Sequence, residues 1–347
     1  MNPLGTIYGA AALARRRWYA RHPGGRRRLA RPVISIGNLT VGGSGKTPAV
    51  AYVARLLLAL GERPAILSRG YGRRVASRQV TVVSDGREVM ADLDRAGDEP
   101  LMLARAVPGA AVVVAPRRFA AGEVAETRLG CTVHLLDDGF QHLMLERDVN
   151  LLLVAPGDLE EPLLPAGRLR EPLAAAAAAD AVVVTGVEAA GAEAVARQLG
   201  LDRCFRAATT VGAPRAVQPY GAAAAIAPDA PVFGVTGIAR PERFFAAAMA
   251  QGWRLTGEMR FRDHHDYTRR DVGRIVDAAR RAGAAAVLTT GKDAVRLEPL
   301  APFPLPFAWL PLDLAIEPAD AFRDWLSARL AAARADLPGT GVENTHR

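Results

Sequence analysis

The stretch that decides the fold is Val33-Ile34-Ser35-Ile36-Gly37-Asn38-Leu39-Thr40-Val41-Gly42-Gly43-Ser44-Gly45-Lys46-Thr47. A β-rich run leads into a glycine-rich turn, and an apolar helical stretch, 49–60, opens at Pro48. A strand, a glycine loop and a helix in that order predict a P-loop, in which backbone N–H groups and a helix N-terminus surround phosphate oxygens. The alternative is a flexible turn that only connects a strand to a helix.

The P-loop prediction gives each residue of the turn a role. Lys46 is expected to reach the β- and γ-phosphates of ATP, and Thr47 is expected to hold Mg²⁺. The common pattern has glycine at the position of Thr40, so Gly42 and Gly43 are expected to supply the flexibility instead. The predicted nucleotide-binding residues are Thr40, Val41, Gly42, Gly43, Ser44, Gly45, Lys46 and Thr47.

Lysine is almost absent from this chain. Lys46 and Lys292 are the only two lysines, against 42 arginines. An ammonium group that fits inside a phosphate-binding loop cannot be replaced by a planar guanidinium. A lysine retained in so arginine-rich a composition is therefore a candidate functional residue, and Lys292 is a candidate on the same ground.

Length and composition indicate a globular protein of about two domains. The chain has 347 residues, half of them apolar, and a net charge of +8. Its two cysteines, Cys131 and Cys204, lie far apart and in no metal-binding spacing. Reduced, structural cysteines are the prediction, as in a cytosolic protein.

The positive charge is concentrated near the start of the chain. No acidic residue precedes Glu62, and residues 15–31 carry eight arginines after an apolar stretch, 3–14, that is too short to span a bilayer. Because the charges follow the apolar stretch, a cleaved signal peptide fits poorly. We predict that residues 1–30 form a basic amphipathic segment on an anionic membrane surface. A nucleic-acid arm and a solvated helix are the alternatives, and no RNA-binding or helix-turn-helix motif favours nucleic acid.

Several polar motifs follow predicted strands. Asp137 and Asp138 end the apolar run 133–136, as in the strand that accompanies a P-loop and binds Mg²⁺. The loop 68–74 carries Arg69, Arg73 and Arg74, which either contact phosphate or form a basic surface. In 97–100, Asp98 and Glu99 are either helix caps favoured by the helix dipole or a general base and a metal ligand.

The rest of the chain predicts a second unit. The core is expected at 31–210, a linker at 211–230, a smaller α/β domain at 231–332 and a disordered tail at 333–347. The alanine run 174–179 predicts an ordinary helix. In 263–267, adjacent His264 and His265 lack further spaced ligands, so a proton-transfer or orienting role is favoured over zinc, with a surface loop as the alternative. The predicted fold class is α/β, with a P-loop NTPase-like parallel sheet.

Taken together and in this order, the motifs resemble those of one family, the tetraacyldisaccharide 4′-kinases of lipid A biosynthesis. The resemblance covers about residues 5–325, and Gly291 departs from it, since glutamate is expected before Lys292-Asp293. The stretches that carry the resemblance are 37–48, 68–72, 97–100, 137–142, 164–172 and 263–267.

The resemblance implies phosphoryl transfer from Mg-ATP to the 4′-hydroxyl of a tetraacylated glucosamine disaccharide 1-phosphate. It places this reaction in a cleft between two α/β domains, on the cytoplasmic face of the bacterial inner membrane, with no obligate protein partner. Asp98 would accept the hydroxyl proton, supported by His264 rather than His265 once the cleft closes. The implied metal ligands are Thr47, Glu99, Asp137 and Asp138, and the candidate substrate contacts are Arg69, Arg73, Arg118, Gln141, His142, Arg170 and His265.

A second hypothesis uses the same P-loop without a lipid acceptor. A P-loop NTPase that acts as a switch or metallochaperone would also contain Lys46 and the pair Asp137-Asp138. It would give no role to Asp98 or the histidines, and its hydrolysis of nucleotide would not respond to lipid.

Overall fold

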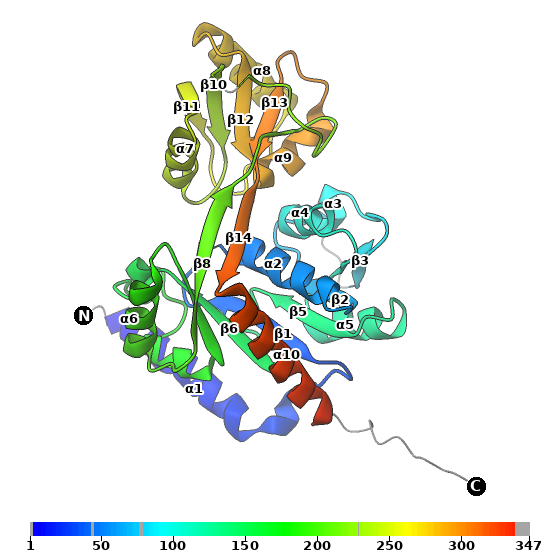
Figure 1. Ribbon diagram of the computed structural model, residues 1–347, viewed down its shortest axis with the longest axis vertical. Coiled ribbons are helices and arrows are strands. Elements are labelled where there is room, and N and C mark those ends of the chain that lie inside the picture. Colours follow the sequence, from blue (N-terminus) through cyan, green and yellow to red (C-terminus); the bar gives the residue numbers. More distant parts are fainter. Residues whose placement is uncertain (1–2, 43–44, 76–78, 228, 337–347) are drawn as a thin grey trace.

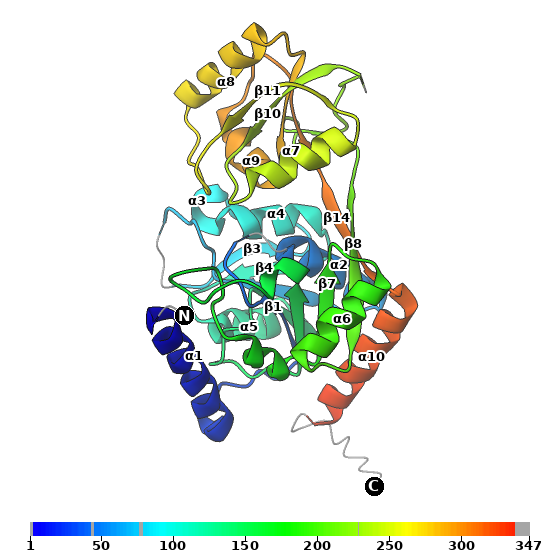
Figure 2. The ribbon, with the colours of Figure 1, turned by 90° about the vertical axis from the view of Figure 1, so that its left-hand side faces the viewer.

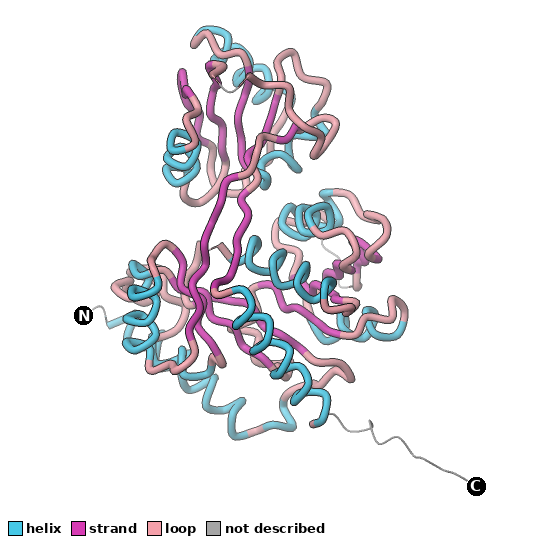
Figure 3. The backbone as a smooth tube through the Cα atoms, in the orientation of Figure 1, coloured by secondary structure: helices cyan, strands magenta, loops and turns pink. Residues whose placement is uncertain are grey.

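A computed structural model describes residues 3–42, 45–75, 79–227 and 229–336. Two lobes, each built on its own β-sheet, are joined by strands β8 (Cys204–Val211) and β14 (Leu312–Glu317) (Figure 1). The tube drawing in Figure 3 shows these two strands running side by side from one lobe toward the other. The prediction of an α/β fold on a mainly parallel sheet is confirmed.

The larger lobe contains a nine-stranded sheet in the order β14-β8-β7-β6-β1-β5-β2-β4-β3. Among the strand pairs of this sheet that the structure describes, β3–β4 and β14–β8 are antiparallel and the others are parallel. Helices cover both faces, which explains why strands such as β1 are buried throughout and read as continuous apolar runs. The other strands are β1 (Val33–Asn38), β2 (Pro64–Ser68), β3 (Thr81–Asp85), β4 (Ala111–Val114), β5 (Val133–Asp137), β6 (Val149–Val154) and β7 (Ala181–Thr185).

The helices of this lobe differ in how they meet the sheet. Helix α2 follows β1 directly and buries Val50, Val53 and Leu57 in the main core. Figure 2 shows α1 and α10 on the outside of the lobe. The helices are α1 (Pro3–Arg21), α2 (Lys46–Ala59), α3 (Leu93–Ala96), α4 (Asp98–Ala106), α5 (Arg118–Thr127), α6 (Ala189–Leu199) and α10 (Ala319–Ala335).

The smaller lobe contains a five-stranded sheet in the order β11-β10-β12-β13-β9. Its separate cores include Val235, Ile275 and Val287 on one face and Phe245 and Leu288 on the other. Its elements are β9 (Arg215–Ala216), β10 (Pro231–Thr236), α7 (Pro241–Ala250), β11 (Arg254–Arg260), α8 (Arg269–Arg281), β12 (Ala286–Thr290), α9 (Gly291–Leu297) and β13 (Phe307–Leu310).

The chain divides between the lobes differently from the prediction. After β13 it returns to the larger lobe, where Leu312 pairs with Val211 and Phe322 is buried in the main core. The range 231–332 was therefore too long, because Leu314 and Ile316 alternate toward that core. The predicted linker 211–230 carries β9, and the alanine run forms a 3₁₀ helix (Leu173–Ala178) instead of an α-helix. The predicted tail began too early, since α10 continues to Ala335; residues 337–347 lie outside the described chain.

Helix α1 rests against the larger lobe through its glycines. A Cβ atom at Gly9 would lie 2.6 Å from Leu163 Cδ1, so a larger residue there would require the Leu163 side chain to shift. The opposite side exposes four large side chains, Leu4, Ile7, Tyr8 and Trp18. In the described part of the chain, no helix combines the length and apolarity needed to cross a bilayer.

Candidate active site

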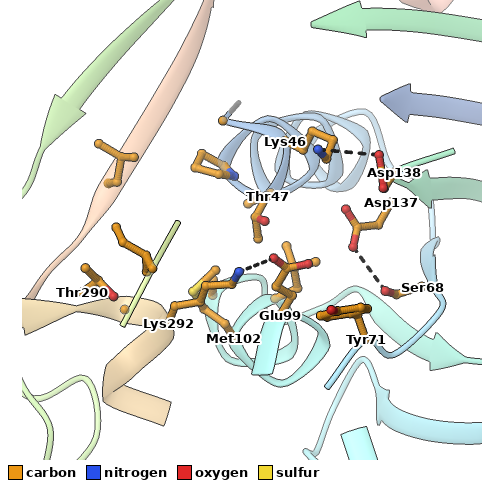
Figure 4. A pocket seen from close by; sticks show the side chains of 18 of the residues that line it. Lys46, Thr47, Ser68, Tyr71, Glu99, Met102, Asp137, Asp138, Thr290 and Lys292 are labelled. Atoms are coloured by element: carbon orange, nitrogen blue, oxygen red, sulfur yellow. Dashed lines mark hydrogen bonds and ion pairs between the residues drawn. The ribbon is translucent and has the colours of Figure 1, made fainter. Parts of the chain in front are cut away.

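A cleft of about 2140 Å³ lies between the two lobes. The P-loop, the end of β5 and the start of α4 line it from the larger lobe, and the start of α9 lines it from the smaller lobe. Figure 4 shows Lys46, Thr47, Asp137 and Asp138 on one side of this cleft and Lys292 on the other. This arrangement follows from the parallel sheet, since loops at the carboxyl ends of neighbouring strands meet at one edge.

The P-loop follows β1 as predicted. Gly42 and Gly45 adopt left-handed backbone conformations, with φ of 97° and 82°, and Gly45 is the N-cap of α2. The Lys46 ammonium donates to Asn38 Oδ1 at 2.9 Å and lies 3.6 Å from Asp138 Oδ1. Gly43 and Ser44 lie outside the described residues.

Thr40 has a structural reason to stand where the common pattern has glycine. Its side chain is buried, and its Oγ1 accepts a hydrogen bond from Asn38 Nδ2 at 3.0 Å. The same hydroxyl donates to Asp158 Oδ1 at 3.4 Å. Thr40 thus ties the base of the loop to the neighbouring segment, a function that glycine cannot perform.

Asp138 is held by a bidentate ion pair. Arg170 Nη1 and Nη2 donate to its two carboxylate oxygens at 2.8 and 2.7 Å. Burial alone would raise the pKa of Asp138, but the Arg170 hydrogen bonds and the charge of Lys46 lower it to about 2. Its φ of 51° is unusual for a residue other than glycine, and such strained backbone is concentrated at functional sites.

Asp137 is also buried, but its surroundings raise its pKa, whereas those of Asp138 lower the pKa of that residue. Ser68 Oγ donates to Asp137 Oδ2 at 3.2 Å. Burial and the nearby charges of Glu99 and Asp138 raise the pKa of Asp137 above its ordinary value. A bound cation would relieve this repulsion, so the carboxylates fit a metal.

The predicted metal ligands do not form a complete coordination shell by themselves. In the ranges described, no group of three or more His, Cys, Asp or Glu side chains is arranged to hold a metal ion. Glu99 instead pairs with Lys292, whose Nζ lies 2.6 Å from Glu99 Oε1 (Figure 4). Mg²⁺ commonly takes one or two carboxylates together with phosphate oxygens and water, which is compatible with this arrangement.

Asp98 and His264 come from different lobes and are in contact. His264 Nδ1 lies 3.0 Å from Asp98 Oδ2, and Arg296 also donates to this oxygen. The backbone N–H of Glu99 donates to Asp98 Oδ1 at 2.9 Å. Burial would raise the pKa of Asp98, but the His264 hydrogen bond and the charges of Arg296 and Lys292 hold it well below the ordinary value.

The capping alternative accounts for the Glu99 N–H that Asp98 accepts, but not for the contacts of Asp98 with the smaller lobe. The N-cap of α4 is Gly97, and the Asp98 side chain is 3% exposed and directed at the smaller lobe. His264 has a φ of 55°, which places its backbone in the left-handed region. Its N–H donates to Gly237 O at 3.1 Å, so the strained loop is held against β10.

The candidate substrate residues fall into two groups. Five of them line the cleft: Arg69, Arg118, Gln141, His142 and Arg170. The other two do not line it. Arg73 Nε donates to Gly70 O at 3.2 Å within its own loop, and the His265 ring stacks on Phe261 with centroids 4.4 Å apart.

His142 is a neutral group among cations. Burial and the charges of Arg118 and Arg147 lower its pKa to about 4. Arg118 is itself buried, and burial lowers the pKa of its guanidinium to about 10 against the opposing effect of Asp137. At neutral pH His142 is therefore an uncharged hydrogen-bonding group on a positively charged wall.

Two residues of the site were not predicted from the sequence. Asn38 Oδ1 accepts from both Lys46 and Arg170, the latter at 2.5 Å, so it holds two cations in place. Its position at the end of β1 was a usable signal. Arg296 contacts Asp98, and nothing distinguishes it among 42 arginines except its spacing of four residues from Lys292.

Helix α1 is connected to the same region. Arg16 Nη2 donates to Glu171 Oε2 at 2.6 Å and to Phe140 O at 3.2 Å. Its guanidinium carbon lies 4.5 Å from the centroid of the Phe140 ring. Gln141 Nε2 donates to the same Glu171 oxygen at 3.2 Å, so one buried carboxylate joins α1 to the loop after β5.

The sequence of this chain matches one family of known proteins. The family described as tetraacyldisaccharide-1-P 4′-kinase (LpxK) matches residues 1–331. The tetraacyldisaccharide 4′-kinase of Geobacter metallireducens is 45% identical over 284 residues, 79% of this chain and 81% of that protein. The one from Koribacter versatilis is 37% identical over 330 residues, 93% and 97% of the two chains.

A solved structure agrees in fold. The crystal structure of LpxK from Aquifex aeolicus, determined in complex with ATP, superposes with a TM-score of 0.77 at 30% identity. The match covers 94% of this chain and 98% of that one. The P-loop, the strand end at Asp137-Asp138 and the matches over nearly the whole chain lead to one conclusion: the chain belongs to the tetraacyldisaccharide-1-P 4′-kinase family.

Proposed function

We propose that the chain transfers the γ-phosphate of ATP to the 4′-hydroxyl of a tetraacylated glucosamine disaccharide 1-phosphate. The observation that carries this proposal is that a P-loop and His264, which contacts the buried Asp98, line one cleft in a member of this kinase family. Phosphoryl transfer depends mainly on positioning and on stabilising charge, and both requirements are met by residues of this cleft.

The P-loop side of the cleft would hold the nucleotide. Lys46 and the N-terminus of α2 supply positive potential, and the left-handed conformations of Gly42 and Gly45 let backbone N–H groups turn toward phosphate oxygens. Lys46 is already oriented by Asn38 and Asp138. Arg170 holds Asp138 in turn, so this part of the site needs little rearrangement.

Thr47, Asp137 and Asp138 would hold Mg²⁺ together with phosphate oxygens, with Glu99 as a further ligand if it leaves Lys292. The raised pKa of Asp137 supports this assignment, because burial and the charges of Glu99 and Asp138 disfavour its ionised form and a bound cation would offset them. The ion would neutralise charge on the phosphates. Asp138, with its lowered pKa, stays ionised throughout.

Asp98 would accept the proton of the attacking hydroxyl, and His264 would support it. Ionised Asp98 is a weak base, so its main contribution is to orient the hydroxyl and to take the proton late in the reaction. We expect the Arg69, Arg118, Gln141, His142 and Arg170 side chains to surround the polar part of the acceptor. Gln141 and His142 are uncharged donors or acceptors suited to sugar hydroxyls.

The N-terminal segment would bring the enzyme to an anionic membrane surface, where an acylated acceptor resides. Exposed Leu4, Ile7 and Trp18 and the nearby arginines suit the interface. Each basic residue near such a surface contributes about 1 kcal/mol before screening. Deleting residues 1–20 should weaken binding to anionic vesicles, and salt should do the same to the full chain. An intact protein that does not bind vesicles contradicts this assignment.

A four-protein kinetic comparison tests the acid–base assignment. Asp98→Ala should lower kcat far more than it raises KM, because its proton contact matters mainly in the transition state. His264→Ala should have a smaller effect, and the double variant should be little worse than Asp98→Ala alone. Multiplicative losses would show that the two residues act independently. An active Asp98→Ala enzyme would reduce Asp98 to a structural residue.

A further inference from the structure

Arg296 contacts both members of the Asp98–His264 pair. It lies in the last turn of α9, and its side chain is 7% exposed. Its Nη2 donates to Asp98 Oδ2 and lies 2.9 Å from His264 Nδ1. Asp98 belongs to the larger lobe and Arg296 to the smaller, so this ion pair crosses between the lobes beside the reacting centre.

The other half of the guanidinium is fixed to the smaller lobe. Arg296 Nη1 donates to Gly237 O at 3.2 Å and to Asp293 Oδ1 at 3.3 Å. Asp293 is fully buried and accepts further hydrogen bonds from Tyr267 OH at 3.1 Å and Thr290 Oγ1 at 2.7 Å. One planar group therefore links a rigid anchor in the smaller lobe to the carboxylate of Asp98.

Polar groups contact both ring nitrogens of His264. Arg296 can only donate, so Asp98 Oδ2 receives Nη2–H from it. His264 Nδ1 lies 3.0 Å from the same oxygen, and Lys292 Nζ, also a donor, lies 3.4 Å from His264 Nε2. The His264 ring is thus contacted from both lobes, by Asp98 Oδ2 and Arg296 Nη2 at Nδ1 and by Lys292 Nζ at Nε2.

We propose that Arg296 is a positioning residue for the phosphoryl transfer, holding Asp98 and His264 in one fixed orientation toward the acceptor hydroxyl. This proposal rests on the function proposed above. Arg296 would act through Asp98, because the Arg296 side chain is itself buried and contacts the Asp98 carboxylate. The planar guanidinium is essential, because its two Nη atoms donate to Asp293 and Asp98 at the same time. A lysine carries the same charge but cannot donate to both carboxylates in this geometry.

Arg296→Lys is the informative variant, and Glu298→Gln is its matched control. Glu298 also pairs across the lobes, with Arg105 Nη1 at 2.5 Å, but does not contact Asp98. Arg296→Lys should lower kcat about 100-fold, as expected when a reacting group is displaced by about 1 Å, with KM changed by less than about threefold. Glu298→Gln should change kcat by less than about threefold, as a partly exposed ion pair permits. Equal losses in the two variants would overturn the proposal.

Two further measurements separate a positioning role from a structural one. In an Asp98→Asn background, Arg296→Lys should add less than about a threefold loss, because its effect passes through the carboxylate; a loss that multiplies would overturn the proposal. Nitrogen NMR signals of the His264 ring should differ between Arg296→Lys and the unmodified enzyme and stay the same in Glu298→Gln, because Arg296 Nη2 lies 2.9 Å from His264 Nδ1. Unchanged His264 signals in Arg296→Lys would overturn the proposal too. These outcomes can be told apart from a failure of the proposed function, in which the unmodified enzyme would transfer no phosphate to the lipid acceptor.

Discussion

Arg16→Ala should release α1 from the larger lobe without unfolding that lobe. The Arg16 and Glu171 side chains are 13% and 4% exposed and 2.6 Å apart. Removing one partner of a buried ion pair costs about 3–5 kcal/mol. The lower end applies here, because Gln141 still donates to Glu171 at 3.2 Å. A loss of about 3 kcal/mol raises the population with α1 detached by more than about 100-fold.

Native-state hydrogen exchange of the α1 amides is the direct assay for this release. Arg17→Ala is the matched control, because Arg17 is exposed on the same helix and its replacement changes helix propensity equally. The α2 amides provide an internal reference for the rest of the lobe. Equal acceleration of α1 exchange in both variants, or faster exchange in α2 as well, would refute the idea that Arg16 docks this helix.

Three other predictions test separate parts of the account. Lys46→Ala should abolish transfer while leaving the thermal midpoint nearly unchanged, because it removes charge stabilisation at the phosphates; near-normal turnover in a folded variant argues against the P-loop assignment. Thr40→Gly should destabilise the protein by about 1–2 kcal/mol in urea unfolding, although glycine is the commoner residue there, since Asn38 and Asp158 lose a buried partner. The pKa of His142 falls from 6.5 to about 4 on folding, so between these values the unfolded chain binds more protons and stability decreases as the pH falls. His142→Gln should flatten this dependence in thermal melts; an unchanged slope would exclude His142 as its source.

The local geometry of the P-loop and of the end of β5 could be predicted from the sequence. The P-loop and the end of β5 are short motifs whose chemistry depends on residues close together in the chain. In a parallel sheet, the carboxyl ends of neighbouring strands lie at one edge, so the fold alone brings these motifs together. The side chains Lys46 and Asp138 consequently lie 3.6 Å apart, as the strand–loop–helix pattern suggested.

The Asp98–His264 side of the site depends on contacts between the lobes, which local patterns do not reveal. The pairs of Asp98 with Arg296 and of Glu99 with Lys292 join residues nearly two hundred positions apart. Arg73 and His265 were predicted as substrate contacts from the loops that carry them, and in the structure they contact Gly70 and Asp271, close to themselves in the chain. β14 was missed because a six-residue strand with an exposed Leu312 gives a weak pattern.

The central claim is that this cleft phosphorylates a lipid acceptor, with Asp98 taking part. The most direct measurement is transfer of labelled γ-phosphate from ATP to a tetraacyldisaccharide 1-phosphate in detergent micelles, comparing the unmodified enzyme with Asp98→Asn and locating the new phosphate on the sugar. The account predicts label at the 4′ position with the unmodified enzyme and at least about a 1000-fold lower kcat with Asp98→Asn. ATP hydrolysis without any labelled lipid, or full transfer by Asp98→Asn, would contradict it.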